Sequence, residues 1–234
     1  MGVGDQAKKT LAAAVDRGIG VQQPTVEKYI ARAKQRNPSA TPSEVIASLE
    51  RQYLSAMIAL GGASGASAAA PAVGTGVGLI VNIAEVGAFV EASALFCLAV
   101  AEVHGVEIDD LERRRTLLMG VLMGNGGSRI VEKVAGRTGT HWAKSLVKAV
   151  PMARIDAVNK VLGPRFITKY GTKQGVLVLG RDLPFGIGAV IGAGGNAALG
   201  RMTVSGARRA FGPAPHNWPS KPPPPDALTA QPNA

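Results

Sequence analysis

Residues 61–102 read GGASGASAAAPAVGTGVGLIVNIAEVGAFVEASALFCLAVAE, an Ala- and Gly-rich stretch that contains neither Lys nor Arg. The surrounding chain has no charged residue of either sign from residue 52 to residue 84. Such a segment is stable only where it is buried, in a protein core or in a bilayer. Pro71 and the glycines that follow it interrupt helix formation, so the sequence predicts two long helices that form a hairpin.

The second half of this hairpin fits two environments. Residues 79–101 are numerous enough to span a bilayer, but the carboxylates of Glu85 and Glu91 oppose insertion about as strongly as the aliphatic side chains favour it. In a soluble bundle the same carboxylates would lie on a solvent-facing stripe. Positions six apart lie about 120° around a helix, so the two groups do not form a paired catalytic site. A packed core and a membrane-inserted or membrane-apposed hairpin both remain open.

Small residues recur at four-residue spacing in the hairpin and again in residues 183–200, which read LPFGIGAVIGAGGNAALG. Residues four apart lie on one face of a helix, and small side chains there let a second helix approach closely. The 183–200 segment is too short and too rich in Gly to span a membrane alone, so we expect a helix packed on the hairpin. The candidates for this close helix contact are Gly61, Gly65, Gly74, Gly78, Gly188, Gly192, Asn196 and Gly200.

The chain has a net charge of +10, and its charges are segregated. Acidic residues dominate 61–112, whereas basic residues dominate 113–181. Residues 130–150 interleave basic and apolar side chains, a pattern typical of an interfacial or partner-binding helix and also of an ordinary surface helix. The three consecutive arginines at 113–115 point in different directions on a helix, which predicts a solvated turn. The candidates for a basic face are Lys133, Arg137, Lys144 and Lys148.

The chain divides into three parts by composition. Residues 1–23 predict a loose arm with a short helix, residues 24–212 a helical domain, and residues 213–234 a proline-rich disordered tail. Inside the domain, Thr41-Pro42-Ser43-Glu44 forms a capping box that opens a helix, Asp109 is expected to cap another, and Gly163-Pro164 is expected to end a third. The N-terminal apolar run is too short for a secretion signal, and the lone Cys97 precludes an intramolecular disulfide.

The sequence shows no recognisable motif for catalysis, cofactor binding or metal binding. The glycines near residue 188 lack the strand-to-helix turn and the following acidic residue of a dinucleotide site. The histidines and Cys97 are not at metal-ligand spacing, and neither a nucleophile elbow nor a phosphate-binding loop is present. We therefore expect no catalytic, cofactor-binding or metal-binding residues, and no enzyme activity.

Three passages resemble the EcsC family, a group of bacterial helical proteins. They are the GGASG opening before the Ala-rich helical pair, AEVHGVEIDDLERRRTLLMGVL at 101–122, and LPFGIGAVIGAGGNAALGRMTVSGARRAFG at 183–212. The resemblance covers residues 56–212 and implies an all-α helical bundle built around an Ala/Gly-rich helical hairpin and a second glycine-rich helix. It implies a fold and an association, and no catalytic residue.

The expected function is that of a non-catalytic accessory protein at the cytoplasmic side of the cell membrane, either peripheral or partly inserted. Its partner would be an anionic membrane surface or a membrane protein. The alternative is a soluble helical module whose basic face contacts nucleic acid or an acidic protein. Aromatic residues make up only 4% of the chain, so stacking platforms for single-stranded nucleic acid are scarce and that partner is less favoured. The sequence leaves the oligomeric state open.

Overall fold

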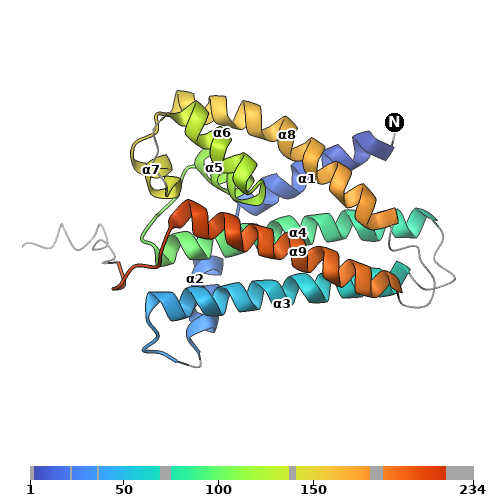
Figure 1. The fold of residues 1–234 in the computed structure, drawn as a ribbon, viewed down its shortest axis with the longest axis horizontal. Helices are drawn as coiled ribbons and strands as arrows, with labels where there is room; N and C mark the ends of the chain where they lie inside the picture. Colours follow the sequence, from blue (N-terminus) through green and yellow to red (C-terminus); the bar gives the residue numbers. More distant parts are fainter. Residues whose placement is uncertain are drawn as a thin grey trace, which may run out of the picture.

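The computed structural model describes residues 3–21, 23–35, 37–68, 75–136, 141–179 and 187–219, with the side chains of 3–8, 10–11, 64–68, 75–84, 167, 169–179 and 187–193 left out. These described residues form nine helices and no strand (Figure 1), which confirms the all-α prediction. The helices are α1 (Val3–Ile19), α2 (Gln23–Lys34), α3 (Pro42–Ala68), α4 (Thr75–Val103), α5 (Leu111–Leu122), α6 (Asn125–Ala135), α7 (Trp142–Lys148), α8 (Met152–Leu179) and α9 (Ile187–Phe211).

The long helices α3, α4 and α9 run alongside one another, and α1, α5, α6 and α8 cover one side of them (Figure 1). Helix α9 lies mainly on α3, and α4 lies between α1 and α3. Large buried side chains pack between these helices. Tyr53 of α3 stacks on Phe96 of α4, with the ring centroids 4.7 Å apart. Trp142 and Phe166 fill the space under the covering helices.

Local signals fix several helix ends. The capping box at the start of α3 is confirmed, since the backbone N–H of Thr41 donates to Glu44 Oε2 at 2.8 Å and the backbone N–H of Glu44 donates to Thr41 Oγ1. Helix α4 ends before Gly105, whose φ of 66° suits glycine, as the sequence predicts. The cap of α5 is Asp110, whose side chain accepts from the Arg113 N–H, so the prediction of Asp109 is one residue early.

The N-terminal segment is a packed helix, which corrects the prediction of a loose arm. Ala14, Val15 and Ile19 of α1 are buried. The backbone of Gly18 lies so close to α4 that a Cβ at this position would be 3.0 Å from the Cβ of Ala94. The helical domain therefore includes α1. The sequence signal was weak because short Ala-rich helices gain most of their stability from packing rather than from propensity.

Two helix boundaries in the middle of the chain also differ from expectation. The amphipathic 130–150 segment is two helices, α6 and α7, and the chain leaves α6 at Gly136 with a φ of 91°. Helix α8 continues through Pro164 to Leu179, although Gly163-Pro164 was expected to end this helix. Proline removes one backbone hydrogen bond, but Leu162 and Phe166 on either side of it are buried, and this packing holds the helix together.

The start of the expected tail is docked on the bundle. The Trp218 indole donates to the backbone oxygen of Ala40 at 3.1 Å, and the Lys34 ammonium lies 4.3 Å from the centre of the indole ring. Pro219 fits against Gly105, where any Cβ would lie 2.7 Å from the Pro219 Cβ. These contacts border a cavity of about 680 Å³ between α2, α7 and the α4–α5 turn. The packed part of the chain therefore extends past residue 212 to at least residue 219, and residues 220–234 lie outside the described residues.

Candidate functional site

Two of the candidates in the second glycine-rich segment, Asn196 and Gly200, face the hairpin. Gly200 lies against α3, because a Cβ on it would be 3.1 Å from side-chain atoms of both Leu54 and Met57. Gly61 and Asn196 are buried. Among the other candidates, Gly74 lies outside the described residues, and the helical Gly65, Gly78, Gly188 and Gly192 have surroundings outside the described side chains.

Polar groups join α4 to its neighbours inside this layer. Glu85 is 3% exposed, and Asn196 of α9 donates its Nδ2 to Glu85 Oε1 at 2.8 Å. The solvent-facing stripe predicted for Glu85 is therefore wrong, because α9 packs over that side of α4. Glu91 does reach the surface, where it pairs with Arg17 of α1 at 3.0 Å. The buried amide and carboxylate fix the alignment of α4 and α9.

A second buried polar contact ties α4 to α3 two turns further on. The Tyr53 hydroxyl lies 2.8 Å from Ser93 Oγ, which in turn donates to the backbone oxygen of Phe89. Burial raises the pKa of Tyr53 above its ordinary value, so the hydroxyl stays protonated. The neutral tyrosine acts as a fixed hydrogen-bond donor between the two halves of the hairpin.

The most apolar stretch of α4 is a core element. Residues 85–103 are the one helical segment, among the residues described, that is long and apolar enough to cross a membrane, and 67% of it is buried inside the protein. Phe89, Val90 and Val100 in this stretch are at most 3% exposed. A bilayer could surround this segment only if α1, α3 and α9 were removed from it.

The uncharged segments of α3, α4 and α9 lie together at one end of the molecule. The second half of α3, the beginning of α4 and the beginning of α9 all reach the end opposite to α7 (Figure 1). We call residues 57–68 of α3 and 75–84 of α4 the uncharged tip; residues 187–200 of α9 also lack charge and run to the same end. Ile58, which is 46% exposed, projects from the tip, and the neighbouring Ala59 and Ala63 are exposed as well.

Exposed arginines mark the place where the uncharged segments end. Arg51 precedes the uncharged part of α3, and Arg201 follows that of α9. Arg51 lines a cavity between α2 and α3 together with Arg32 and Glu44, whereas Arg201 follows the point at which α9 packs on α3. Sequence reasoning did not single out either residue. The available signal in the sequence was the position of each arginine, directly at the end of a run without charged residues.

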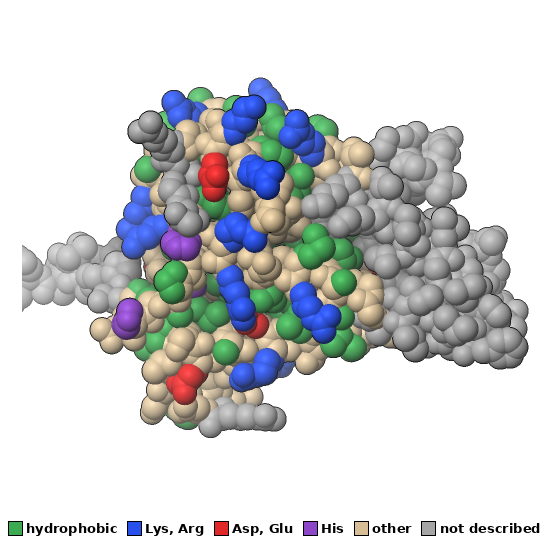
Figure 2. All heavy atoms as spheres, viewed as in Figure 1, with side chains coloured by type: hydrophobic (Ala, Val, Ile, Leu, Met, Phe, Trp, Pro, Cys, Tyr) green, Lys and Arg blue, Asp and Glu red, His purple; other side chains and the backbone are tan. Residues whose placement is uncertain are grey.

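Basic side chains are scattered over one face of the body. Figure 2 shows Lys and Arg spread over α6, α8 and α9, with few acidic side chains among them. Of the predicted basic face, Lys133 is exposed on α6, Lys144 and Lys148 are exposed on α7, and Arg137 lies outside the described residues. The break between α6 and α7 places these lysines on two separate helices. They therefore do not form the single helical stripe that the sequence predicted.

The three consecutive arginines hold the covering helices in place. Arg113 donates to the backbone oxygens of Leu146 and Val150 beside the end of α7, the second at 2.9 Å. Arg114 donates to the backbone oxygen of Val21 just beyond α1, at 2.7 Å. Carbonyl groups at helix ends lack partners within the helix, so guanidinium groups satisfy them well. The prediction of a solvated turn is wrong for this segment.

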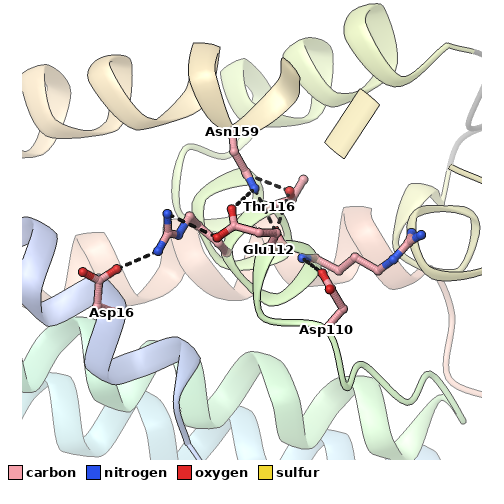
Figure 3. A network of polar contacts seen from close by, with 7 residues as sticks. Asp16, Asp110, Glu112, Thr116 and Asn159 are labelled. Carbon is pink, nitrogen blue, oxygen red and sulfur yellow. Dashed lines mark hydrogen bonds and ion pairs between the residues drawn. The ribbon is translucent and has the colours of Figure 1, made fainter. Parts of the chain in front are cut away.

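Arg115 belongs to a polar network between α1, α5 and α8 (Figure 3). It pairs with Asp16 at 2.8 Å and with Glu112 at 3.5 Å. The Asn159 side chain of α8 donates to Glu112 Oε2 at 2.9 Å and accepts from the Thr116 hydroxyl at 2.7 Å. A cavity of about 450 Å³ adjoins the network. The two acidic groups of the network, Asp16 and Glu112, already have partners within it. The network therefore serves to hold α1, α5 and α8 together.

A smaller cavity of about 370 Å³ lies between α3, the end of α4 and the end of α9. On its wall, Arg208 of α9 binds both oxygens of Glu50, with Nε 2.7 Å from Oε1, and the hydrogen-bonded carboxylate raises the pKa of Arg208. The His104 ring lies 5.2 Å from the Phe211 ring, and its Nδ1 is 2.9 Å from the backbone oxygen of Val100. These contacts connect α9 to both helices of the hairpin.

The described residues contain no group of three or more His, Cys, Asp or Glu side chains placed to hold a metal ion. Burial raises the pKa of the Cys97 thiol to about 12, so it is a poor nucleophile at neutral pH. The sequence matches no known family model and no characterised protein, and the fold matches no solved structure. Inference about function therefore depends on the surfaces described above.

Proposed function

We propose that this chain is a non-catalytic accessory protein of the EcsC type, which associates with the cytoplasmic side of a bacterial membrane. The observation that carries the proposal is the uncharged tip at one end of a strongly basic molecule. Ile58 and the neighbouring exposed alanines give this end an apolar surface. Burial of this surface in a bilayer would remove apolar area from water without desolvating a charge.

Flotation with lipid vesicles tests this proposal. The full chain is expected to float with vesicles of phosphatidylcholine and phosphatidylglycerol at low salt. Ile58→Asp places a charge on the tip and is expected to abolish flotation. Leu111→Asp is the matched control, because Leu111 is 52% exposed at the first residue of α5, away from the tip. Wild-type protein that stays in the soluble fraction with every vesicle, or equal binding by Ile58→Asp and wild type, would contradict the proposal.

The alternative function is a soluble module whose basic face binds nucleic acid or an acidic protein. The spread of Lys and Arg over α6, α8 and α9 supports it (Figure 2). This alternative predicts binding to duplex DNA or to polyglutamate that falls steeply with salt and does not change in Ile58→Asp. Charge reversal of Lys144 and Lys148, both exposed on α7, would weaken such binding and leave flotation largely intact if the tip is the membrane contact.

A further inference from the structure

The cavity between α2 and α3 has a volume of about 870 Å³, and we call it the α2–α3 groove. The two helices meet where the Tyr29 hydroxyl donates to the backbone oxygen of Leu49, and residues close to this contact line the groove. Apart from three alanines, every described residue along it has a polar or charged side chain; these residues are Arg32, Gln35, Asn37, Glu44, Ser48, Arg51, Gln52 and Ser55.

The groove has an arginine on each of its two helices. Arg32 follows Tyr29 by one helical turn and Arg51 follows Leu49 by two residues, so the contact between Tyr29 and Leu49 brings both arginines to the same part of the groove. Neither guanidinium group has a hydrogen bond or an ion pair with another described residue. The carboxylate of Glu44 also lines the groove, but its Oε2 already accepts from the backbone N–H and the hydroxyl of Thr41.

These side chains define the chemistry of a ligand. A guanidinium group binds phosphate through paired N–H groups, and two of them on facing helices suit one phosphate. The amides and hydroxyls along the groove, Gln35, Ser48, Gln52 and Ser55 among them, suit the hydroxyl groups of a polyol. The described lining contains no aromatic side chain on which a nucleotide base would stack. A phosphate that carries a polyol therefore fits the groove better than a nucleotide does.

We propose that the α2–α3 groove binds a phosphorylated polyol, with Arg32 and Arg51 on the phosphate and the neighbouring amides and hydroxyls on the polyol. Soluble sugar phosphates have this chemistry, and so does the glycerol phosphate headgroup of phosphatidylglycerol. The exposed Ile58 lies on the same face of α3 as Arg51 and Ser55, one turn beyond the groove. A headgroup in the groove would place its acyl chains beside Ile58. For this lipid source the inference rests on the proposed membrane association.

Calorimetric titration without lipid tests the groove by itself. At constant ionic strength, wild type is expected to bind sn-glycerol 3-phosphate more tightly than inorganic phosphate. Arg32→Gln/Arg51→Gln should bind both ligands about tenfold more weakly or worse, because hydrogen bonds between charged groups are strong. The matched control is Arg129→Gln/Lys133→Gln, which removes two exposed charges from α6 and should bind like wild type. Since Arg32 and Arg51 are exposed, the melting temperature should not change.

A second variant tests the polyol part of the site. Ser48→Ala/Ser55→Ala removes two hydroxyls from the groove and should weaken binding of glycerol phosphate about fivefold, with no effect on inorganic phosphate. The proposal is wrong if wild type binds neither ligand, or if the two charge variants lose affinity equally. An equal effect of the serine variant on both ligands, or none on either, would overturn the assignment of a polyol.

Competition in flotation identifies the source of the ligand. For a lipid headgroup, excess glycerol phosphate at constant ionic strength should reduce flotation with phosphatidylglycerol vesicles to the level of Arg32→Gln/Arg51→Gln. For a soluble sugar phosphate, glycerol phosphate should bind without changing flotation. Because the titration contains no lipid, a chain that binds glycerol phosphate and never floats would refute the membrane association alone. A chain that floats and binds no glycerol phosphate would refute the groove alone.

Discussion

Three glycines of α9 offer a graded test of how closely this helix packs. A Cβ on Gly194 would meet nothing within 4 Å, and a Cβ on Gly200 would lie 3.1 Å from two side-chain atoms, Leu54 Cδ2 and Met57 Cγ. A Cβ on Gly206 would overlap the backbone oxygen of Val121 in α5 and lie 3.1 Å from its carbonyl carbon. That oxygen is already held by the N–H of Gly124, so it has little freedom to move.

The expected effects follow from two opposing contributions. Alanine is favoured over glycine in a helix by about 1 kcal/mol, which applies at all three positions. Overpacking costs about 1 to 3 kcal/mol and is largest where backbone rather than side chain must move. Gly194→Ala should therefore stabilise the fold by about 0.5 to 1 kcal/mol, Gly200→Ala should be close to neutral, and Gly206→Ala should destabilise it by about 1 to 2 kcal/mol after the helix gain.

Thermal and urea unfolding of the three variants give the comparison. For a chain of this size, 1 kcal/mol corresponds to about 2 to 4 °C, so the melting temperatures should fall in the order Gly194→Ala, Gly200→Ala, Gly206→Ala. Because all three changes are the same and lie in one helix, propensity cancels between them. If Gly206→Ala is as stable as Gly194→Ala, α9 does not approach the α5 backbone and the packing described here is incorrect.

Three further predictions concern the C-terminal segment, the buried amide and the thiol. Trp218→Ala should lower the free energy of unfolding by about 1 to 2 kcal/mol through loss of its hydrogen bond and its cation contact, whereas a chain ending at Pro219 should melt like the full chain. Asn196→Leu removes a buried hydrogen-bond donor to Glu85 and should lower the free energy of unfolding by about 1 to 3 kcal/mol, measured by urea unfolding. A variant as stable as wild type would show that this hydrogen bond does not stabilise the fold. The folded Cys97 thiol has a pKa of about 12 and its unfolded counterpart one near 9, so stability should be full below pH 9 and fall as the pH rises from 9 to 12. Cys97→Ala should reduce that slope, and native wild type should not react with a thiol reagent at pH 8.

The sequence predicted helices wherever the signal was local. The capping box at Thr41 and the glycine at 105 depend on a few neighbouring residues, and both were correct. It failed where distant contacts decide the outcome. Pro164 does not end α8 because buried residues on both sides hold the helix. The N-terminal helix, which the sequence did predict, is packed and not loose because α4 covers it.

For the polar residues too, the sequence predicts what depends on local spacing and not what depends on distant contacts. Of the small-residue face predicted from helical spacing, Gly200 lies against α3, but the spacing could not show that α9 covers Glu85. Arg113 and Arg114 have long side chains that reach backbone oxygens far away in the sequence, and no local pattern encodes those partners. The sequence shows where the charge-free runs begin and end. Only the packing of α3, α4 and α9 shows that these runs lie side by side at one end of the molecule.

The composition of the tip determines how strongly it can hold a membrane. Alanine and glycine expose little apolar surface, and burial yields only about 25 cal/mol per Å², so insertion of the tip alone is weak. The basic residues around it add attraction that depends on anionic lipid and on salt. Each contribution alone is too weak for stable anchoring. The proposed association is therefore reversible, and loss of the apolar contact in Ile58→Asp should release the protein from the bilayer.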